Sequence, residues 1–142
     1  MLRLTIDTNV VASAFRSRSG ASFALIELIR KKRVRMLATP PLFLEYEEVL
    51  KRPEQLAASG LTLTDLDTAL DALAALIEPI ETYLSWRPQL DDPDDEMVLE
   101  AALNGRADAL VTYNAAHFQA SAARFGVRLA RPVEILQEVA RP

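Results

Sequence analysis

Short apolar segments that alternate with amphipathic helical patterns constrain the fold of this chain more than any other feature. Strand-like segments cover residues 2–6, 34–38, 109–112 and 127–130, with a weaker β-like stretch at 79–86. Segments with helical spacing cover residues 10–15, 21–30, 42–50, 54–60, 64–77, 97–103, 114–123 and 132–140. Alternation at this spacing favours an α/β fold with a mainly parallel sheet. We expect a three-layer sandwich in which four to five strands lie between helices on both faces.

Residue chemistry predicts two of the helix boundaries. Thr39 is expected to cap the helix that follows it, because threonine is a good N-cap and the two prolines after it suit a first helical turn. Asn104 and Gly105 are expected to end the helix over 97–103, since glycine closes helices readily.

The size of the chain predicts one domain over residues 1–142, because 142 residues suffice for a single well-formed core. Charged residues or prolines break every apolar stretch before the roughly 20 residues that a membrane span needs. Arg3 and Asp7 lie where a signal peptide would be uncharged. We therefore expect a cytoplasmic protein without a membrane segment.

The residue types that are missing or rare exclude several kinds of site. The chain has no cysteine and one histidine, His117, which excludes disulfides, thiolate zinc sites and any site with two imidazoles. The net charge is −4, but residues 91–96 hold five acids in six positions, and without them the net charge would be +1. Residues 30–35 hold five cations in six positions. One acidic and one basic cluster therefore stand out from a nearly neutral chain.

Several acidic side chains are expected at the carboxyl ends of the strands, where parallel α/β folds bind ligands. Asp7 follows the first strand, Glu45 lies one turn into the helix after the second, and Asp94 and Asp95 begin an apolar helix. Taken alone, Asp7 is also a good helix N-cap, and the 91–96 cluster a solvated loop. Crowded carboxylates repel one another, however, and a divalent cation such as Mg²⁺ or Mn²⁺ removes that cost.

Four segments in order carry a resemblance to a known family. They are Asp7-Thr8-Asn9-Val10, the stretch 40–53 around Glu45, residues 91–103, and residues 107–114, which end in Thr112-Tyr113-Asn114. Together they resemble PIN-domain ribonucleases, and among these the VapC-type toxins of toxin–antitoxin systems. The resemblance extends from Leu2 to about Leu136 and implies a PIN-like fold.

The resemblance also implies a set of acidic site residues. Asp7 resembles the first acid of the family and Glu45 the second, with Glu48 the weaker alternative. The third is Asp95 or Asp94; Asp95 is favoured, because the helix then buries its apolar face, and Asp94 is interpreted as the cap of that helix. Asp7 and Asp95, with Asp94, are the expected metal ligands.

The fourth acidic position of the family is Asn114 in this chain. An amide oxygen can coordinate Mg²⁺ or orient a water, but it carries no charge and cannot act as a base. One bound ion is therefore expected rather than two. The departure also motivates an alternative function, a catalytically weak PIN fold that binds RNA or a protein.

By resemblance, the chain is a ribonuclease that hydrolyses RNA phosphodiesters with a metal-activated water. Glu45 would either bind the metal or act as general base. Thr8 and Thr112 would support the carboxylates through hydrogen bonds, and Asn9 would orient the loop or contact phosphate. A phosphatase-like hydrolase with Asp7 as nucleophile ranks well behind, because a second Asp two residues later is missing.

Candidate substrate contacts are Arg16 and Arg18, in the loop after the first helix. The 30–35 run either complements the end of its helix or forms a phosphate-contacting edge for RNA. His117 is a possible proton donor, although capping or exposure is the commoner role. A homodimer and an antitoxin partner are expected from the resemblance and from apolar helices that exceed one small core.

Overall fold

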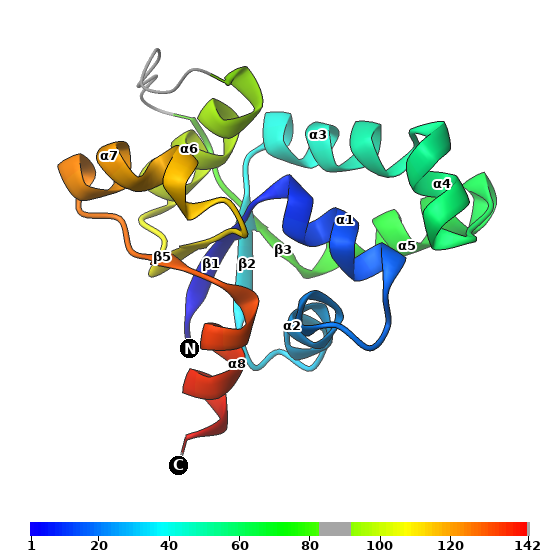
Figure 1. The fold of residues 1–142 in the computed structure, drawn as a ribbon, viewed down its shortest axis with the longest axis horizontal. Coiled ribbons are helices and arrows are strands. Elements are labelled where there is room, and N and C mark those ends of the chain that lie inside the picture. Colours follow the sequence, from blue (N-terminus) through cyan, green and yellow to red (C-terminus); the bar gives the residue numbers. More distant parts are fainter. Residues whose placement is uncertain (83–91, 142) are drawn as a thin grey trace.

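Five parallel strands form the centre of the computed structural model, which describes residues 1–82 and 92–141 (Figure 1). The strands are β1 (Arg3–Ile6), β2 (Arg35–Ala38), β3 (Ile77–Pro79), β4 (Ala109–Val111) and β5 (Leu129–Ala130), in the order β3-β2-β1-β4-β5. Every pair of neighbouring strands is parallel. The expected α/β fold with a parallel sheet is confirmed.

The described residues contain eight helices, seven of them between strands and the eighth, α8, after β5. They are α1 (Thr8–Arg16), α2 (Ala21–Arg30), α3 (Pro40–Leu50), α4 (Pro53–Ser59), α5 (Leu63–Leu76), α6 (Pro93–Gly105), α7 (Ala115–Phe125) and α8 (Pro132–Ala140). Right-handed crossovers put helices on one face when the chain steps from β1 to β2 to β3, and on the other face when it steps from β4 to β5. Figure 1 shows α6 and α7 on one side of the strands and α1 and α2 on the other. The expected helices on both faces are therefore present.

The strands form the buried centre of this arrangement. Leu4, Ile6, Leu110 and Val111 have no exposed surface, because helices cover both faces of β1 and β4. Buried parallel strands commonly read as continuous apolar runs. β4 does so, with the sequence Ala-Leu-Val, whereas β1 includes the fully buried Thr5.

The register of the two central strands places two polar residues side by side. Ile6 of β1 pairs with Val111 of β4. Asp7 and Thr112, the next residue on each strand, therefore leave the sheet together at its carboxyl edge. Asp7 is then the N-cap residue of α1, and Asn114 is the N-cap residue of α7.

The observed strand does not match the weak β-like stretch predicted at 79–86. The strand β3 covers Ile77–Pro79, and α5 ends at Leu76 instead of continuing to residue 77. Ile77 pairs with Met36 of β2, so a β-branched residue at the end of the helix is recruited to the sheet edge. Residues 80–82 are not in a strand, and residues 83–86 of the prediction lie outside the described residues.

At the ends of α6, the predicted cap is wrong, whereas the predicted end at Asn104 and Gly105 is confirmed. Asp92, not Asp94, caps the N-terminus, and its side chain accepts a hydrogen bond from the Asp94 backbone N–H. Gly105 is the last residue of the helix and is buried, whereas Arg106 adopts the left-handed conformation that follows it. A Cβ at Gly105 would lie 3.1 Å from side-chain atoms of Ile80 and Leu37, so the glycine serves close packing.

Thr39 caps α3 as predicted, since its hydroxyl accepts a hydrogen bond from the backbone N–H of Leu42. Across residues 1–82 and 92–141, none of the helices has the length and apolar character that crossing a bilayer requires.

Candidate active site

Asp7 is a buried carboxylate at the carboxyl end of β1. Only 4% of the residue is exposed, and its side chain makes no capping hydrogen bond to α1 although it stands at the N-cap position. Instead, its Oδ2 accepts a hydrogen bond of 2.7 Å from the Thr112 hydroxyl of the neighbouring strand. The simple interpretation of Asp7 as a helix cap therefore does not account for its side chain.

Burial raises the pKa of Asp7 above the usual value of an aspartate, even though the Thr112 hydroxyl, the nearby backbone amides of Thr8 and Asn9, and the charge of His117 all lower it. The fold thus keeps a carboxylate where its charged form is poorly solvated. A bound cation would favour that charged form.

Tyr46 connects α3 to the same edge of the sheet. Its ring is fully buried, and its hydroxyl donates a hydrogen bond to the Ile6 carbonyl, directly before Asp7. Burial, followed by the charge of Asp7, raises the pKa of Tyr46, so the phenol stays protonated and keeps donating. Tyr46 therefore holds the middle of α3, which carries Glu45, against the end of β1.

Glu45 is a second buried carboxylate, with 6% of the residue exposed. Burial is the main cause that raises its pKa to about 7, and the charges of Asp94 and Glu48 raise it further, whereas Arg52 lowers it. A carboxyl group with a pKa near 7 can accept or release a proton at neutral pH. Glu48 is exposed and forms an ion pair with Arg52, which supports Glu45 as the second acid.

The start of α6 brings the third group of acids to this edge. Asp95 has 14% of its side chain exposed, and its Oδ2 lies 3.3 Å from Nδ1 of His117 on α7. Burial raises the pKa of Asp95 first, the charges of Asp7 and Asp92 raise it further, and His117 lowers it. Asp7 and Asp95 are therefore close enough to repel each other.

A pocket of about 320 Å³ opens beside these acids, and Asp92, Asp95, Ala116 and His117 line it. The His117 side chain is 58% exposed, so the imidazole faces solvent while one nitrogen contacts Asp95. His117 was expected only as a possible proton donor and not among the principal site residues. Its position three residues after Asn114, in the first turn of a helix that begins at a strand end, was the available signal.

The residues expected to support the carboxylates occupy different environments. Thr112 is fully buried, donates to Asp7, and accepts a hydrogen bond of 2.9 Å from the Asn114 backbone N–H. Thr8 is also buried, and its Oγ1 has no hydrogen-bond partner within the described residues. Asn9 is exposed, and Asn114 is half-buried without a side-chain capping bond.

Arg16 and Arg18 lie away from the acids. Arg16 is the last residue of α1, so about 12 Å of helix separates it from Asp7. Its guanidinium donates to Gln55 of α4, which in turn donates to the Ala12 carbonyl. Arg18 lines a separate pocket of about 230 Å³ between α1, α2 and α5. The structure does not bring these two arginines together with the acids, and their substrate role stays a prediction.

The donor chemistry of the edge fits a divalent cation. Asp7, Glu45 and Asp95 form no ion pair with lysine or arginine inside the part of the chain that the structure describes, and each has a raised pKa. Within residues 1–82 and 92–141 there is no group of three or more Asp, Glu or His side chains that could hold a metal ion. The charges of Asp7 and Asp92 act on Asp95, and those of Asp94 and Glu48 act on Glu45. The carboxylates of Asp7 and Asp95 fit Mg²⁺, which usually takes one or two carboxylates together with waters and substrate phosphate.

Asp94, expected as a further metal ligand, is exposed, and its charge raises the pKa of Glu45. Its role as a ligand, and that of Asn114 as the fourth site position, stay predictions.

Comparison with known proteins gives one finding that bears on this site. A family model described as PIN domain matches residues 3–116, which include Asp7, Glu45, Asp95 and Asn114. The match ends just before His117. No curated protein and no solved structure matched the chain. Because the family model spans most of the sequence, the chain belongs to the PIN domain family, whose members are generally nucleases.

Proposed function

We propose that the chain is an endoribonuclease that depends on Mg²⁺ or Mn²⁺ and acts as the toxin of a toxin–antitoxin pair, similar to VapC-type toxins. One observation carries the enzymatic part. Asp7 is buried, is held by Thr112, and lies near Asp95, and no lysine or arginine in the described residues pairs with either carboxylate. Membership of a nuclease family supports the same reaction class.

Asp7 and Asp95 are the residues that would hold the ion, with Thr112 keeping the Asp7 carboxylate oriented through its hydroxyl. When bound, the ion supplies positive charge against the scissile phosphate group. Glu45, with a pKa of about 7, accepts the proton of the attacking water at its carboxylate. A new bond forms between water oxygen and phosphorus, the P–O bond to the leaving group breaks, and that oxygen takes a proton from solvent.

Cleavage of a structured RNA in Mg²⁺ tests this proposal, with EDTA and the Asp7→Asn variant as comparisons. We expect both to reduce cleavage by at least about 100-fold, because losing a group that acts only in the transition state costs that order of rate. Asp71→Asn is the matched control, since Asp71 is exposed on α5. Cleavage that survives in EDTA and in Asp7→Asn would contradict the proposal.

A catalytically weak PIN fold that binds RNA or a protein is the second candidate. Two observations favour it: the amide at Asn114, and the lack of a three-carboxylate group within residues 1–82 and 92–141. RNA binding without cleavage at micromolar protein in Mg²⁺ would support this second function and not the first.

The toxin role also predicts partners, a homodimer and an antitoxin. Exposed apolar side chains on α3 and α5, Leu44 at 61% and Leu63 at 54%, support an interface on those helices. Light scattering of the purified chain and co-purification with the product of an adjacent gene test the two partners separately. A monomer at all concentrations would remove the dimer from the proposal.

A further inference from the structure

The amino edge of the sheet, opposite the acids, carries cations without carboxylate partners. Lys31, Lys32 and Arg33 in the turn between α2 and β2 are exposed, and they form no ion pair with any residue that the structure describes. Arg106, in the turn between α6 and β4, is exposed at the same edge. The amino edge thus holds several cations for which no ion pair is found among the described residues, beside carboxylates such as Glu78 that pair with arginines.

Lys32 occupies a backbone conformation that normally belongs to glycine. Its φ is 59°, and its N–H donates to the Ile29 carbonyl while the Arg33 N–H donates to the Leu28 carbonyl, which ends α2. Gly60 and Gly126 adopt the same left-handed conformation directly after α4 and α7. A lysine in this conformation costs stability that glycine would not, and Arg106, with a φ of 49°, is a second cation of this edge that adopts it.

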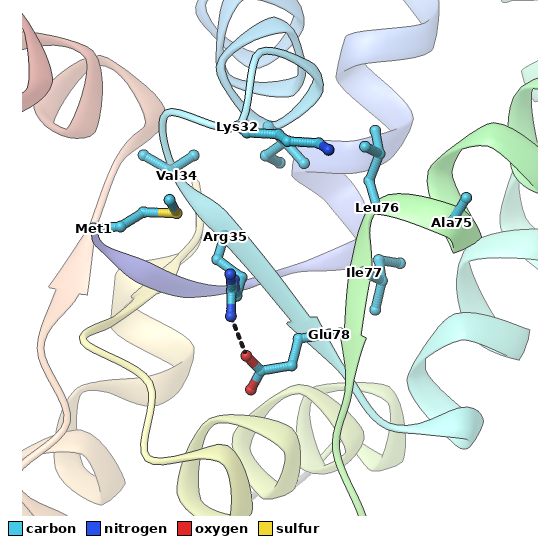
Figure 2. A pocket seen from close by; sticks show the side chains of 9 residues that line it. Met1, Lys32, Val34, Arg35, Ala75, Leu76, Ile77 and Glu78 are labelled. Carbon is cyan, nitrogen blue, oxygen red and sulfur yellow. Dashed lines mark hydrogen bonds and ion pairs between the residues drawn. The ribbon is translucent and has the colours of Figure 1, made fainter.

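The Lys32 side chain borders the pocket shown in Figure 2, which has a volume of about 370 Å³. From the turn after α2, the side chain extends toward Leu76 at the end of α5 (Figure 2). Val34 and Ile77 contribute apolar wall, and Arg35 contributes a guanidinium. The pocket therefore combines an apolar surface with two cations, within the size range of ligand sites.

The carboxylate in this pocket does not cancel the Lys32 charge. Glu78 forms ion pairs with both Arg35 and Arg3, whose strands lie side by side with these two residues in register. Its single negative charge is thus already shared between two guanidinium groups. Lys32 remains as a cation available to an external anion.

We propose that this pocket binds a phosphate of an RNA strand that also reaches the acidic edge. The inference rests on the proposed function in one respect, that the substrate is RNA. Carboxylates repel a polyanion, so affinity for the strand must come from cations elsewhere on the molecule, and lysine contacts with phosphate provide it. Arg3 and Asp7, at the two ends of β1, are about 13 Å apart along the strand, and an oligonucleotide that joins the two edges must follow the helices that cover the sheet. The apolar wall accommodates the sugar or base next to the bound phosphate.

Binding of a labelled RNA of about 12 nucleotides, measured by fluorescence anisotropy in EDTA, tests the pocket without cleavage. We expect Lys32→Gln and Lys32→Gly to weaken binding about five- to tenfold at about 50 mM salt and to reduce the salt slope by about 1. Lys32→Arg should restore binding. Lys31→Gln, a neighbouring cation that does not line the pocket, should change affinity less than about twofold.

Thermal unfolding shows whether the variants are folded. Lys32→Gly should raise the Tm by about 3 °C, because it removes the left-handed strain, whereas Lys32→Gln should leave it unchanged. If Lys32→Gly binds RNA more weakly although it is more stable, the loss of binding comes from the missing lysine and not from unfolding. That result would support phosphate binding in the pocket.

Three results would overturn the inference: unchanged binding by both Lys32 variants, an equal loss in Lys31→Gln, or polyglutamate displacing the RNA at matched charge. The last result would identify the edge as a surface for an acidic protein segment. Because the assay contains no divalent ion, failure of the pocket leaves cleavage untouched. If the protein fails to cleave RNA in Mg²⁺, the proposed ribonuclease function fails. A loss of RNA binding in the Lys32 variants would still support the pocket.

Discussion

Three aspartates near helix starts show how the surroundings of a residue decide its role. Asp65 closes a capping box with Thr62, and Asp92 accepts from a backbone N–H, both at exposed sites where aspartate stabilises a helix. Asp7 stands at the N-cap of α1, as Asp92 does at that of α6, but it is buried and bonded to Thr112. Burial turns a residue that usually stabilises a helix into one whose charge is a cost to the fold.

Replacing Thr112 by valine tests this cost at the scale of one residue. Valine keeps the shape but removes the donor to Asp7 and the acceptor for the Asn114 N–H. We expect a loss of about 2–3 kcal/mol in the free energy of unfolding, because a buried charged group loses a hydrogen bond. The loss should shrink as the pH falls and Asp7 takes up a proton, because the Thr112 hydroxyl favours the charged form of Asp7. Denaturant unfolding over a series of pH values measures it.

Thr112→Ser is the control, because serine keeps the hydroxyl and should cost less than about 1 kcal/mol, close to one buried methyl group. An equal loss in both variants would mean that the Asp7 bond contributes nothing specific.

The α6 helix shows how an element adapts to the sheet that it covers. Gly105 lies at its buried end, against Ile80 and Leu37, and the Arg3 guanidinium donates to the Gly105 carbonyl at 2.8 Å. The helix can approach β2 this closely because the position has no Cβ. The same helix begins at the acidic edge with Asp95, so its packing at one end positions the carboxylate at the other.

Gly105→Ala should therefore destabilise the protein, although alanine is normally the better helix former by about 1 kcal/mol. The new Cβ would lie 3.1 Å from Ile80 Cγ1 and from Leu37 Cδ1, so side chains must shift, and overpacking of this kind costs about 1–3 kcal/mol. We expect a net loss of about 1 kcal/mol in thermal or denaturant unfolding.

Ile80→Ala in the Gly105→Ala background removes the Ile80 atoms that crowd the new Cβ and leaves Leu37 Cδ1, so the two substitutions should be less harmful together than the sum of each alone. Strict additivity would contradict the packing explanation.

The distribution of charge gives the whole molecule a pH dependence. Asp7, Glu45 and Asp95 have raised pKa values in the folded state, so the fold binds more protons there than the unfolded chain does. Stability therefore falls as the pH rises from the ordinary carboxyl range through about 7, the pKa of Glu45. Glu27, Glu78, Glu134 and Glu138 have lowered pKa values through arginine contacts or a backbone N–H, and their contribution is lost only as the pH falls below that range.

We expect the Tm without divalent ions to be higher near pH 5 than near pH 8. Mg²⁺ at about 10 mM should raise the Tm at pH 8 more than at pH 5, because a cation relieves the repulsion only when the carboxylates are charged. Differential scanning fluorimetry with and without EDTA measures both effects. The Asp7→Asn variant should lose most of the Mg²⁺ effect, and an equal Mg²⁺ shift at both pH values would contradict the site.

Much of the fold was predictable because it depends on near neighbours in the chain. Apolar runs of strand length, helical spacing and the Thr39 cap concern residues within a few positions of one another, and each was recognisable in the sequence. The same alternation, together with the resemblance to PIN domains, predicted that Asp7, Glu45 and Asp95 lie at the carboxyl edge of the sheet.

Which of these side chains meet depends on the sheet order and on helix packing. The Asp7–Thr112 hydrogen bond joins residues 105 positions apart, and it exists only because β4 lies directly beside β1. The contact of His117 with Asp95, the buried Gly105 and the double ion pair of Glu78 have the same origin. Local chemistry determines where elements begin and end, whereas burial and charge pairing arise only when distant elements pack together.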